Sequence, residues 1–395
     1  MAKKQDPKSW QLATKLVRGG TLRSQFGETS EAIFMNSGFC YGSAEEAESR
    51  FNGSKPGFVY SRYSNPSLAM LEERLALMEG AERCLVMASG MAAVFAAMMC
   101  QLKTGDHVVA SRVLFGSCYH IITQILPRYG IEYTLVDGAD SKAWQKAFRK
   151  NTTVVFVETP ANPTLDIVDI AMVARLCKKA GARLILDNVF STPLLQHPFT
   201  LGADIVVYST TKHIDGQGRT LGGAVLGKRA FMDDILLPFH RHTGPAMSPF
   251  NAWITLKGLE TLDLRVERHC HNAQTLAEFL EKHPKIARVY YPGLKSHPHY
   301  AVAQKQMKNG GPLIAFEVKG GKKAAFGFMN RLKIIDISNN LGDAKSLITH
   351  PASSTHANIA AKERMTLGIS DSLLRLSVGI EDEGDLMKDI AQALG

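Results

Sequence analysis

The chain has 395 residues, of which 45% are apolar and 21% charged, and its Lys and Arg exceed its Asp and Glu by 46 − 37 = 9. This composition excludes a disordered chain, a collagen, a coiled coil and a small disulfide-stapled scaffold, and the length predicts about two to three domains. The basic residues are dispersed, without a run of five like charges or interleaved aromatic residues. A solvated surface with an anion-binding pocket is therefore favoured over a nucleic-acid interface.

The N-terminal segment, residues 1–55, contains Gly and Ser and shows no strong hydrophobic period, which predicts an arm. Its first 20 residues contain no apolar stretch typical of a signal peptide. The six cysteines of the chain are scattered, without C-x-x-C pairs or zinc-ligand spacing, which is typical of a reducing compartment. We therefore expect a cytoplasmic protein.

The pattern of apolar residues over residues 56–248 predicts a large α/β domain. Leu68, Leu71, Leu75 and Met78 recur at the spacing of one helical face. Further along, short apolar runs bounded by turn signals alternate with helical patterns, which predicts a mostly parallel sheet covered on both faces. These runs are His107–Ala110, Tyr133–Val136, Val154–Val157, Leu184–Leu186, Ile205–Tyr208 and Ala224–Leu226.

The segment Cys84–Leu102 has no charged residue over 19 positions, a length that permits a membrane span. It contains Ser89-Gly90 near its start, however, and is rich in Ala and Met. We expect a buried strand over Cys84–Ala88, a turn and then a buried helix, and no membrane partner.

From residue 249 onward the pattern changes. Long helical patterns at Asn251–Leu264 and Ala273–Glu281 are followed by shorter strand-like and helix-like pieces. This change predicts a smaller C-terminal α/β domain over residues 249–395.

Ligands of parallel α/β sheets bind at the carboxyl ends of the strands, so the residues after each apolar run are candidates for a site. Ser89-Gly90-Met91 opens a helix, where free amide groups can hold a phosphate, although a tight strand-to-helix turn explains the same pattern. Ser209 and Thr211 follow another run and add two hydroxyl groups.

Two charged residues also follow apolar runs. Asp187 is either a helix cap or a carboxylate that faces a cationic ligand atom, because burying it alone is costly. Lys212 is either a surface lysine or a nucleophile. A phosphate cup, a carboxylate and a lysine match the needs of pyridoxal phosphate, whose phosphate needs donors, whose ring nitrogen needs an anion and whose aldehyde needs an amine.

Seven motifs stand out along the chain: Tyr60-Ser-Arg62-Tyr-Ser-Asn65-Pro66, Ser89-Gly90-Met91-Ala92, Glu158-Thr-Pro-Ala-Asn162-Pro163, Asp187-Asn188, Ser209-Thr-Thr-Lys212, His350-Pro-Ala-Ser-Ser-Thr-His356 and Arg375-Leu-Ser-Val-Gly-Ile-Glu381. In these motifs and their order, over residues 15–394, the sequence resembles the Cys/Met-metabolism family of pyridoxal-phosphate enzymes. That family includes cystathionine synthases and lyases, methionine γ-lyases and homoserine-ester sulfhydrylases. The resemblance implies pyridoxal 5'-phosphate as cofactor and fold type I, the aspartate-aminotransferase-like fold, with residues 56–248 as the cofactor-binding domain.

The resemblance also implies roles for single residues. Lys212 would form the Schiff base with the cofactor and then move protons, and Asp187 would pair with the ring nitrogen. The cofactor phosphate would be bound by Ser89, Gly90, Met91, Ser209 and Thr211.

Four further residues receive roles in the same way. Tyr60 and Arg62 would reach the cofactor phosphate of a neighbouring subunit, which implies an active site shared across a dimer, within a homotetramer. Arg375 would bind the substrate α-carboxylate through its planar fork. Asn162 would lie near that carboxylate and the cofactor ring hydroxyl.

Phe115 departs from the family's usual pattern, because most members carry a tyrosine that stacks on the cofactor ring at this position. Phe115 would keep the stacking face but lose the phenol. A cysteine thiol is mostly protonated at neutral pH and benefits from such a base, whereas sulfide needs less help. The change therefore favours a sulfhydrylase. Ser117 stands where methionine γ-lyases carry a signature cysteine, and Cys118 is one residue away.

Asn340 is a second departure, since it replaces a serine that binds the substrate carboxylate in many relatives. Its amide can still donate a hydrogen bond. A succinyl ester would need a further cation near the mouth of the site, for which Arg50, Lys55 and Arg112 are candidates.

We therefore predict an enzyme that performs γ-replacement on O-succinylhomoserine with sulfide, giving homocysteine and succinate in methionine biosynthesis. Methionine γ-lyase and cystathionine γ-synthase or γ-lyase activities stay open as alternatives, as does a basic binding protein on the same fold. The three His-x-His pairs have no carboxylate or cysteine at ligand spacing, so we expect no metal.

Overall fold

The structure is a computed structural model that describes residues 6–395, so the first five residues of the predicted arm lie outside it. The chain divides into two compact units. The first consists of Met1–Gln101, Val207–Thr211 and Arg219–Thr261. The second consists of Leu102–Val206, Lys212–Gly218 and Leu262–Gly395. The division into an arm, a large domain and a C-terminal domain at residues 55 and 248 stays a prediction.

The first unit is organised around helix α3 (Pro66–Glu79), which packs on strand β1 (Arg83–Met87). Asn65 caps α3 by accepting a hydrogen bond from the Ser67 N–H, and Gly80 ends it in the left-handed region at φ 75°. Strand β1 pairs with β7 (Gly223–Gly227) in antiparallel fashion. The remaining helices are η1 (Pro7–Ser9), α1 (Leu12–Arg18), α2 (Ala44–Phe51), α4 (Gly90–Met99), α9 (Arg229–Phe231), the π-helix η5 (Met232–Leu236), α10 (Leu237–Thr243) and α11 (Pro249–Leu259).

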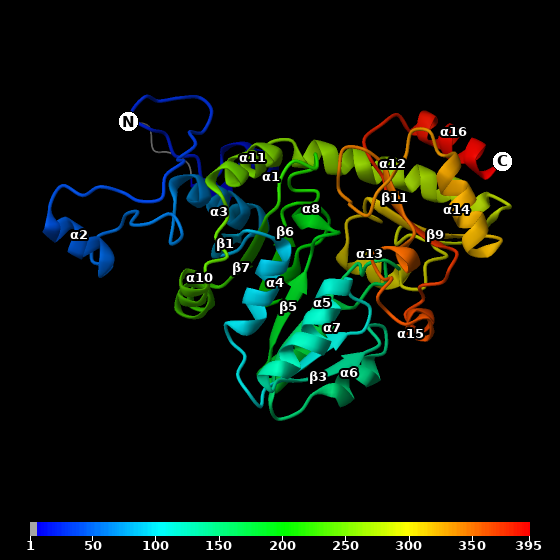
Figure 1. The fold of residues 1–395 in the computed structure, drawn as a ribbon, viewed down its shortest axis with the longest axis horizontal. Helices are drawn as coiled ribbons and strands as arrows, with labels where there is room; N and C mark the ends of the chain where they lie inside the picture. The colour runs from blue at the N-terminus through cyan, green and yellow to red at the C-terminus, as the bar shows by residue number, and fades with distance from the viewer. Residues whose placement is uncertain (1–5) are drawn as a thin grey trace. The chain divides into compact units, whose positions relative to one another are not determined.

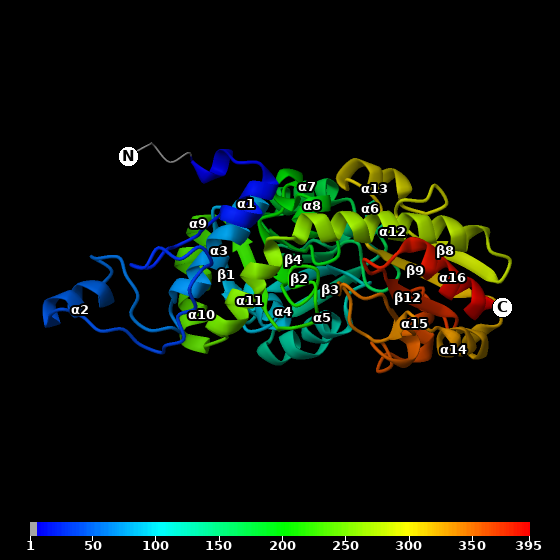
Figure 2. The same ribbon diagram turned by 90° about the horizontal axis from the view of Figure 1, so that it is seen from above.

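Helix α2 differs from the rest of the first unit. It buries none of its residues, and in both views it stands apart from the other helices of this unit (Figures 1 and 2). Apolar burial is the main source of helix stability in a folded protein. Helix α2 therefore gains little of that stabilisation within this chain.

The uncharged segment after Arg83 folds as the sequence predicts. Strand β1 is buried from Cys84 to Met87, Ser89 caps the next helix, and α4 packs on β1 and β7. Among the helices of residues 6–395, none combines the length and the apolarity that crossing a membrane requires.

The second unit contains a parallel sheet with the strand order β5-β4-β2-β3. Its strands are β2 (His107–Ser111), β3 (Glu132–Val136), β4 (Thr152–Glu158) and β5 (Arg183–Asp187), and β6 (Ile205–Ser209) runs from this unit into the first. All six predicted apolar runs are strands, because Val, Ile and Leu suit strands covered on both faces. The helices of this part are α5 (Gly116–His120), η2 (Ile121–Ile125), η3 (Leu126–Tyr129), α6 (Ser141–Ala147), α7 (Ile170–Ala180), α8 (Thr192–Leu195) and η4 (Pro198–Leu201).

The C-terminal part of the second unit is a five-stranded sheet of order β10-β11-β12-β9-β8. Helices α12 (Leu262–Lys282) and α16 (Glu383–Leu394) lie side by side (Figures 1 and 2). The remaining elements are β8 (Ile286–Tyr290), α13 (Tyr300–Gln306), β9 (Leu313–Val318), α14 (Gly321–Arg331), β10 (Asp336–Ile337), β11 (Leu347–Thr349), η6 (Pro351–Ser353), α15 (Ala361–Thr366) and β12 (Leu373–Ser377).

The two helices predicted at the start of this region have different bounds in the structure. Helix α11 ends at Leu259, and α12 is a single helix of 21 residues. The hydrophobic period lapses in its middle because polar residues are buried there. Arg265 donates to the His213 carbonyl oxygen at 2.8 Å, and Asn272 donates to the Gly379 carbonyl oxygen at 3.1 Å. A buried polar side chain with such partners keeps the helix packed where an apolar pattern is missing.

Candidate active site

The predicted phosphate-binding residues of the first unit lie where β1 leads into α4. The Ser89 hydroxyl accepts a hydrogen bond from the Ala92 N–H at 3.1 Å, which leaves the amide groups of Gly90 and Met91 at the open end of the helix. A Cβ on Gly90 would lie 2.6 Å from the Ser209 Cβ, so only glycine lets the helix start approach Ser209. This arrangement brings two free amides and a hydroxyl together, as phosphate binding requires.

Thr211 belongs to the same unit. The Gly222 N–H donates to the Thr211 hydroxyl oxygen at 3.0 Å, and this fixes the side chain on the loop before β7. The Thr211 hydroxyl in turn donates to the Gly222 carbonyl oxygen at 3.3 Å, so binding an anion would require it to exchange this long hydrogen bond. The predicted phosphate-binding residues Ser89, Gly90, Met91, Ser209 and Thr211 all lie within this first unit.

Tyr60 and Arg62 also lie in the first unit. The guanidinium carbon of Arg62 is 5.4 Å from the centre of the Tyr60 ring and 4.8 Å from that of Tyr63. Arg62 also donates to the carbonyl oxygen of Arg241. The Tyr60 side chain is 43% exposed. The predicted contact with a neighbouring subunit stays a prediction.

Asp187 ends β5 as a buried carboxylate in the second unit. It accepts one hydrogen bond, from the Val189 N–H at 3.1 Å, and within residues 6–395 no basic side chain forms an ion pair with it. Burial therefore raises its pKa to about 7. A buried carboxylate without a cationic partner is suited to bind a ligand that carries a positive charge.

Lys212 lies in the same unit as Asp187. Its Nζ donates to the Asn340 Oδ1 at 2.6 Å. Burial, with a smaller contribution from the positive charge of Arg375, lowers its pKa to about 8. Asn340 therefore contacts the predicted reactive lysine, and its side-chain oxygen accepts a hydrogen bond from that lysine.

Arg375 lies on β12 and is 1% exposed. Its Nη1 donates to the Asn162 Oδ1 at 2.9 Å, and its Nη2 donates to the carbonyl oxygens of Asn339 and Asn340 at 2.9 and 3.1 Å. Its Nε has no hydrogen-bond partner among the described residues. These partners are all neutral, so they do not compensate the charge of the guanidinium, and Nε stays a donor without a partner in the described part of the chain.

Phe115 precedes α5, and its N–H donates to the Glu158 Oε2 at 2.8 Å. Glu158 also accepts from the Asn162 N–H at 2.7 Å. Glu158 has no role among the sequence predictions, although it ends β4 as Asp187 ends β5, and the two residues are direct partners in the parallel ladder. The position after an apolar run was a signal that could have identified it.

Cys118 is a second residue whose position the sequence did not reveal. Its sulfur lies within 4.8 Å of ligand oxygens of both Glu158 and Asp187, and in the described part of the chain this is the one group with spacing that could hold a metal ion. The paired histidines of the sequence form no such group within residues 6–395. Burial, and to a smaller extent the carboxylates of Asp187 and Glu158, raises the pKa of the Cys118 thiol well above its usual value.

Comparisons with known proteins identify the family. The model of the family described as Cys/Met metabolism PLP-dependent enzyme matches residues 13–395. The chain belongs to this family. It is 52% identical to an O-succinylhomoserine sulfhydrylase of Mycobacterium tuberculosis, over 97% of this chain and 95% of the relative. It is 42% identical to an L-methionine gamma-lyase of Porphyromonas gingivalis, over 99% of both chains.

Solved structures agree with this membership of the Cys/Met-metabolism family. The metB structure from Corynebacterium glutamicum has a TM-score of 0.93 and 38% identity, over 98% of this chain and 99% of the other. A provisionally assigned O-acetylhomoserine (thiol)-lyase of Campylobacter jejuni has a TM-score of 0.94 and 32% identity, over 98% of this chain and the whole of the other. That structure carries a pyridoxyl-lysine phosphate. The predicted fold and cofactor are thereby confirmed.

The residues of this chain fit the cofactor of the Cys/Met-metabolism family. The glycine cradle at Gly90 suits its phosphate, and the unpaired carboxylate of Asp187 suits a protonated ring nitrogen. Lys212, whose pKa is lowered to about 8, suits the aldehyde, because its amine is partly neutral near pH 8.

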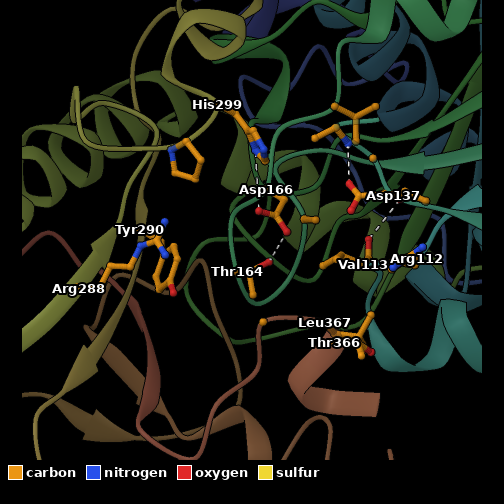
Figure 3. Close-up of a pocket in the computed structure, with 17 residues that line it drawn as sticks. Arg112, Val113, Asp137, Thr164, Asp166, Arg288, Tyr290, His299, Thr366 and Leu367 are labelled. Carbon is orange, nitrogen blue, oxygen red and sulfur yellow. Dashed lines mark hydrogen bonds and ion pairs between the residues drawn. The ribbon is translucent and has the colours of Figure 1, made fainter. Parts of the chain in front are cut away.

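A separate cavity of about 340 Å³ lies in the second unit, and none of the predicted catalytic, cofactor-binding or α-carboxylate-binding residues lines it (Figure 3). Asp166 projects into it, accepts a hydrogen bond from Thr164 at 2.9 Å and lies 3.8 Å from the His299 ring nitrogen. Arg112, a candidate for the succinyl carboxylate, lines this cavity together with Asp137.

The other two candidates for the succinyl carboxylate lie in the first unit. Arg50 and Lys55 both form ion pairs with Glu46, at 2.8 and 3.1 Å. Their charges are therefore already partly compensated within the N-terminal segment.

Proposed function

We propose that this enzyme catalyses γ-replacement on O-succinylhomoserine with sulfide, giving homocysteine and succinate. Phe115 carries the proposal, since its ring has no proton to give or take and its backbone is fixed by Glu158. An acceptor that is already ionised near neutral pH suits such a site. Relatives named O-succinylhomoserine sulfhydrylase are 45% and 52% identical to this chain, which also supports the proposal.

Substrate binding would rest on Arg375 and Asn162. The guanidinium would bind the α-carboxylate through donors that the neutral partners leave free. Asn162 would hold the guanidinium in its orientation, because its Oδ1 accepts from Nη1. The neutral carbonyl oxygens of residues 339 and 340 fix the other nitrogen of the fork.

Proton transfer would rest on Lys212. As a neutral amine it would take the proton from the substrate Cα and then move a proton at Cβ, which lets succinate leave from Cγ and hydrosulfide add there. Its pKa of about 8 leaves a fraction of the amine neutral at physiological pH, unlike an ordinary lysine. Asn340 would hold Nζ in place through the 2.6 Å hydrogen bond.

Bound pyridoxal phosphate supplies the electron sink that stabilises negative charge at the substrate Cα. Asp187 would favour the protonated ring by placing a buried carboxylate opposite the ring nitrogen. Phe115 would cover one face of the ring and exclude water from it. The five predicted phosphate-binding residues of the first unit would hold the cofactor phosphate.

The proposal is tested by comparing acceptors and esters with purified enzyme. Rates of homocysteine formation from sulfide and of cystathionine formation from cysteine are measured on O-succinylhomoserine and O-acetylhomoserine. We expect the succinyl ester with sulfide to give the highest kcat/KM. A cystathionine rate equal to or above the homocysteine rate would show that the acceptor is wrong, and a preference for the acetyl ester would show that the ester is wrong.

Methionine γ-lyase activity is a second candidate, because a relative with that name is 42% identical over 99% of both chains. The buried Cys118 lies beside the two carboxylates of the site, although one position away from the cysteine expected in such lyases. Release of 2-oxobutanoate from methionine alone, at a rate comparable to homocysteine formation, would favour this candidate.

We further propose a homotetramer in the cytoplasm, made of dimers that share their active sites. The partly exposed Tyr60, the cation of Arg62 beside it and the unburied helix α2 offer a surface in the first unit for a second subunit. Light scattering of the purified protein measures the mass, and a monomeric active enzyme would contradict the proposal.

A further inference from the structure

Glu158 is a buried carboxylate with two backbone donors and no direct cation. It is 4% exposed, and its two oxygens accept separate hydrogen bonds from the N–H groups of Phe115 and Asn162. Within residues 6–395 no basic side chain forms an ion pair with it. These two hydrogen bonds hold the carboxylate in one orientation. Burial and the charge of Asp187 raise the pKa of Glu158 to about 8, and the two N–H donors and the charge of Arg375 oppose this rise, so the carboxylate is ionised above pH 8.

Arg375 is the complementary case, a buried cation without a direct anion. Its partners are the Asn162 side chain and two backbone carbonyl oxygens, and no carboxylate of the described residues lies within ion-pair distance of it. Burial lowers the pKa of Arg375 to about 10, and the charge of Glu158 opposes this effect. A buried cation of this kind requires a counter-charge.

Asn162 connects the two charges. Its N–H donates to the Glu158 Oε1 at 2.7 Å, and its Oδ1 accepts from the Arg375 Nη1 at 2.9 Å. A carboxylate paired directly with Arg375 would occupy the same donors that a substrate carboxylate needs. Because Asn162 lies between the two residues, Glu158 supplies the opposite charge without occupying the donors of Arg375.

We propose that Glu158 is a positioning residue that acts through Asn162 as the remote counter-charge of Arg375. It keeps the guanidinium charged and oriented while leaving it free to bind the substrate α-carboxylate. This inference rests on the proposed function, in which Arg375 binds that carboxylate. Other titratable groups face Glu158 as well, namely Asp187 on the neighbouring strand and Cys118 on α5. Both are acids, so neither supplies a counter-charge for Arg375.

The test measures binding of a carboxylate against its neutral amide in the holoenzyme. L-2-aminobutanoate and L-2-aminobutanamide are titrated separately at pH 9, where Glu158 and Arg375 are both charged, and the change in the cofactor absorption band gives each dissociation constant. Neither probe carries a leaving group at Cγ, so no γ-replacement interferes. The wild type should prefer the acid, and Glu158→Gln should reduce that preference about tenfold, since it removes the charge at nearly constant shape.

Two further variants separate the effect of the Glu158 charge from the effect of its hydrogen bonds to the backbone. Glu158→Asp keeps the charge and should retain most of the preference, even if its shorter side chain lowers the melting temperature. Glu79→Gln is a matched control, because Glu79 is similarly buried but accepts a hydrogen bond from the Tyr208 hydroxyl and forms no hydrogen bond or ion pair with a predicted site residue within residues 6–395. It should leave the acid-to-amide ratio unchanged.

The outcomes distinguish this inference from the function on which it rests. A wild type that binds acid and amide equally would overturn the role of Arg375 as carboxylate clamp, and with it the proposed function. A wild type that prefers the acid, with Glu158→Gln retaining the full preference, would overturn the inference alone. Equal loss of the preference in Glu158→Asp and Glu158→Gln, with cofactor still bound, would also overturn it, because charge would then not be the determinant.

Discussion

Asp187→Asn should change the stability of the cofactor-free protein and its affinity for the cofactor in opposite directions. In the absence of a cation the buried carboxylate is unfavourable, since it accepts one backbone hydrogen bond and its pKa rises from 3.8 to about 7. Asparagine has nearly the same shape without the charge. The variant should therefore be the more stable protein without cofactor and the weaker binder of cofactor.

The magnitude follows from the pKa difference. A folded-state pKa above the unfolded value means that the folded protein binds the proton more tightly, so this group costs stability as the pH rises from 3.8 through 7. The full difference corresponds to about 4 kcal/mol above pH 7, at about 1.4 kcal/mol for each pKa unit. At pH 5 the cost falls to about 1–2 kcal/mol.

The assay is urea unfolding of wild type and Asp187→Asn, after removal of the cofactor with hydroxylamine, at pH 8 and pH 5. We expect the variant to be the more stable protein at pH 8, by up to about 4 kcal/mol, with a smaller gap at pH 5. Cofactor titration should show affinity lower by about ten- to a hundredfold, the value of one hydrogen bond to a charged group. An equal gap at both pH values, or a less stable variant at pH 8, would refute the reasoning.

Three further outcomes follow from the site. Lys212→Ala should lose homocysteine formation by about a hundred- to ten-thousandfold and retain no cofactor after borohydride treatment and denaturation, and a covalently labelled variant would contradict this role. Phe115→Tyr should raise kcat/KM with cysteine relative to sulfide, because the phenol restores a proton acceptor, and an unchanged ratio would remove that argument. Mixing inactive Arg62→Ala and Lys212→Ala subunits should restore about a quarter of wild-type activity if active sites are shared across a dimer, whereas no recovery after confirmed subunit exchange would show separate sites.

The sequence alone determined the strands, the main helices and several candidate residues. Continuous Val, Ile and Leu runs predicted the buried parallel strands, and the ends of those strands identified Asp187 and Lys212 as candidates. Local sequence patterns suffice for these predictions, because apolar periodicity and the residue types at strand ends depend only on neighbouring residues. These local rules did not predict the long helix α12, since Arg265 and Asn272 are buried polar residues whose partners lie far away in the chain.

Tertiary structure alone decided how the site is held together. The predicted contact of the Asn340 amide with the substrate carboxylate stays a prediction, whereas its oxygen accepts a hydrogen bond from Lys212, 128 positions away in the chain. Glu158 was part of a quoted motif without a role until its carboxylate was seen to hold Phe115 and Asn162. Hydrogen bonds between distant segments depend on how sheets and loops pack, and no local pattern of the sequence records them.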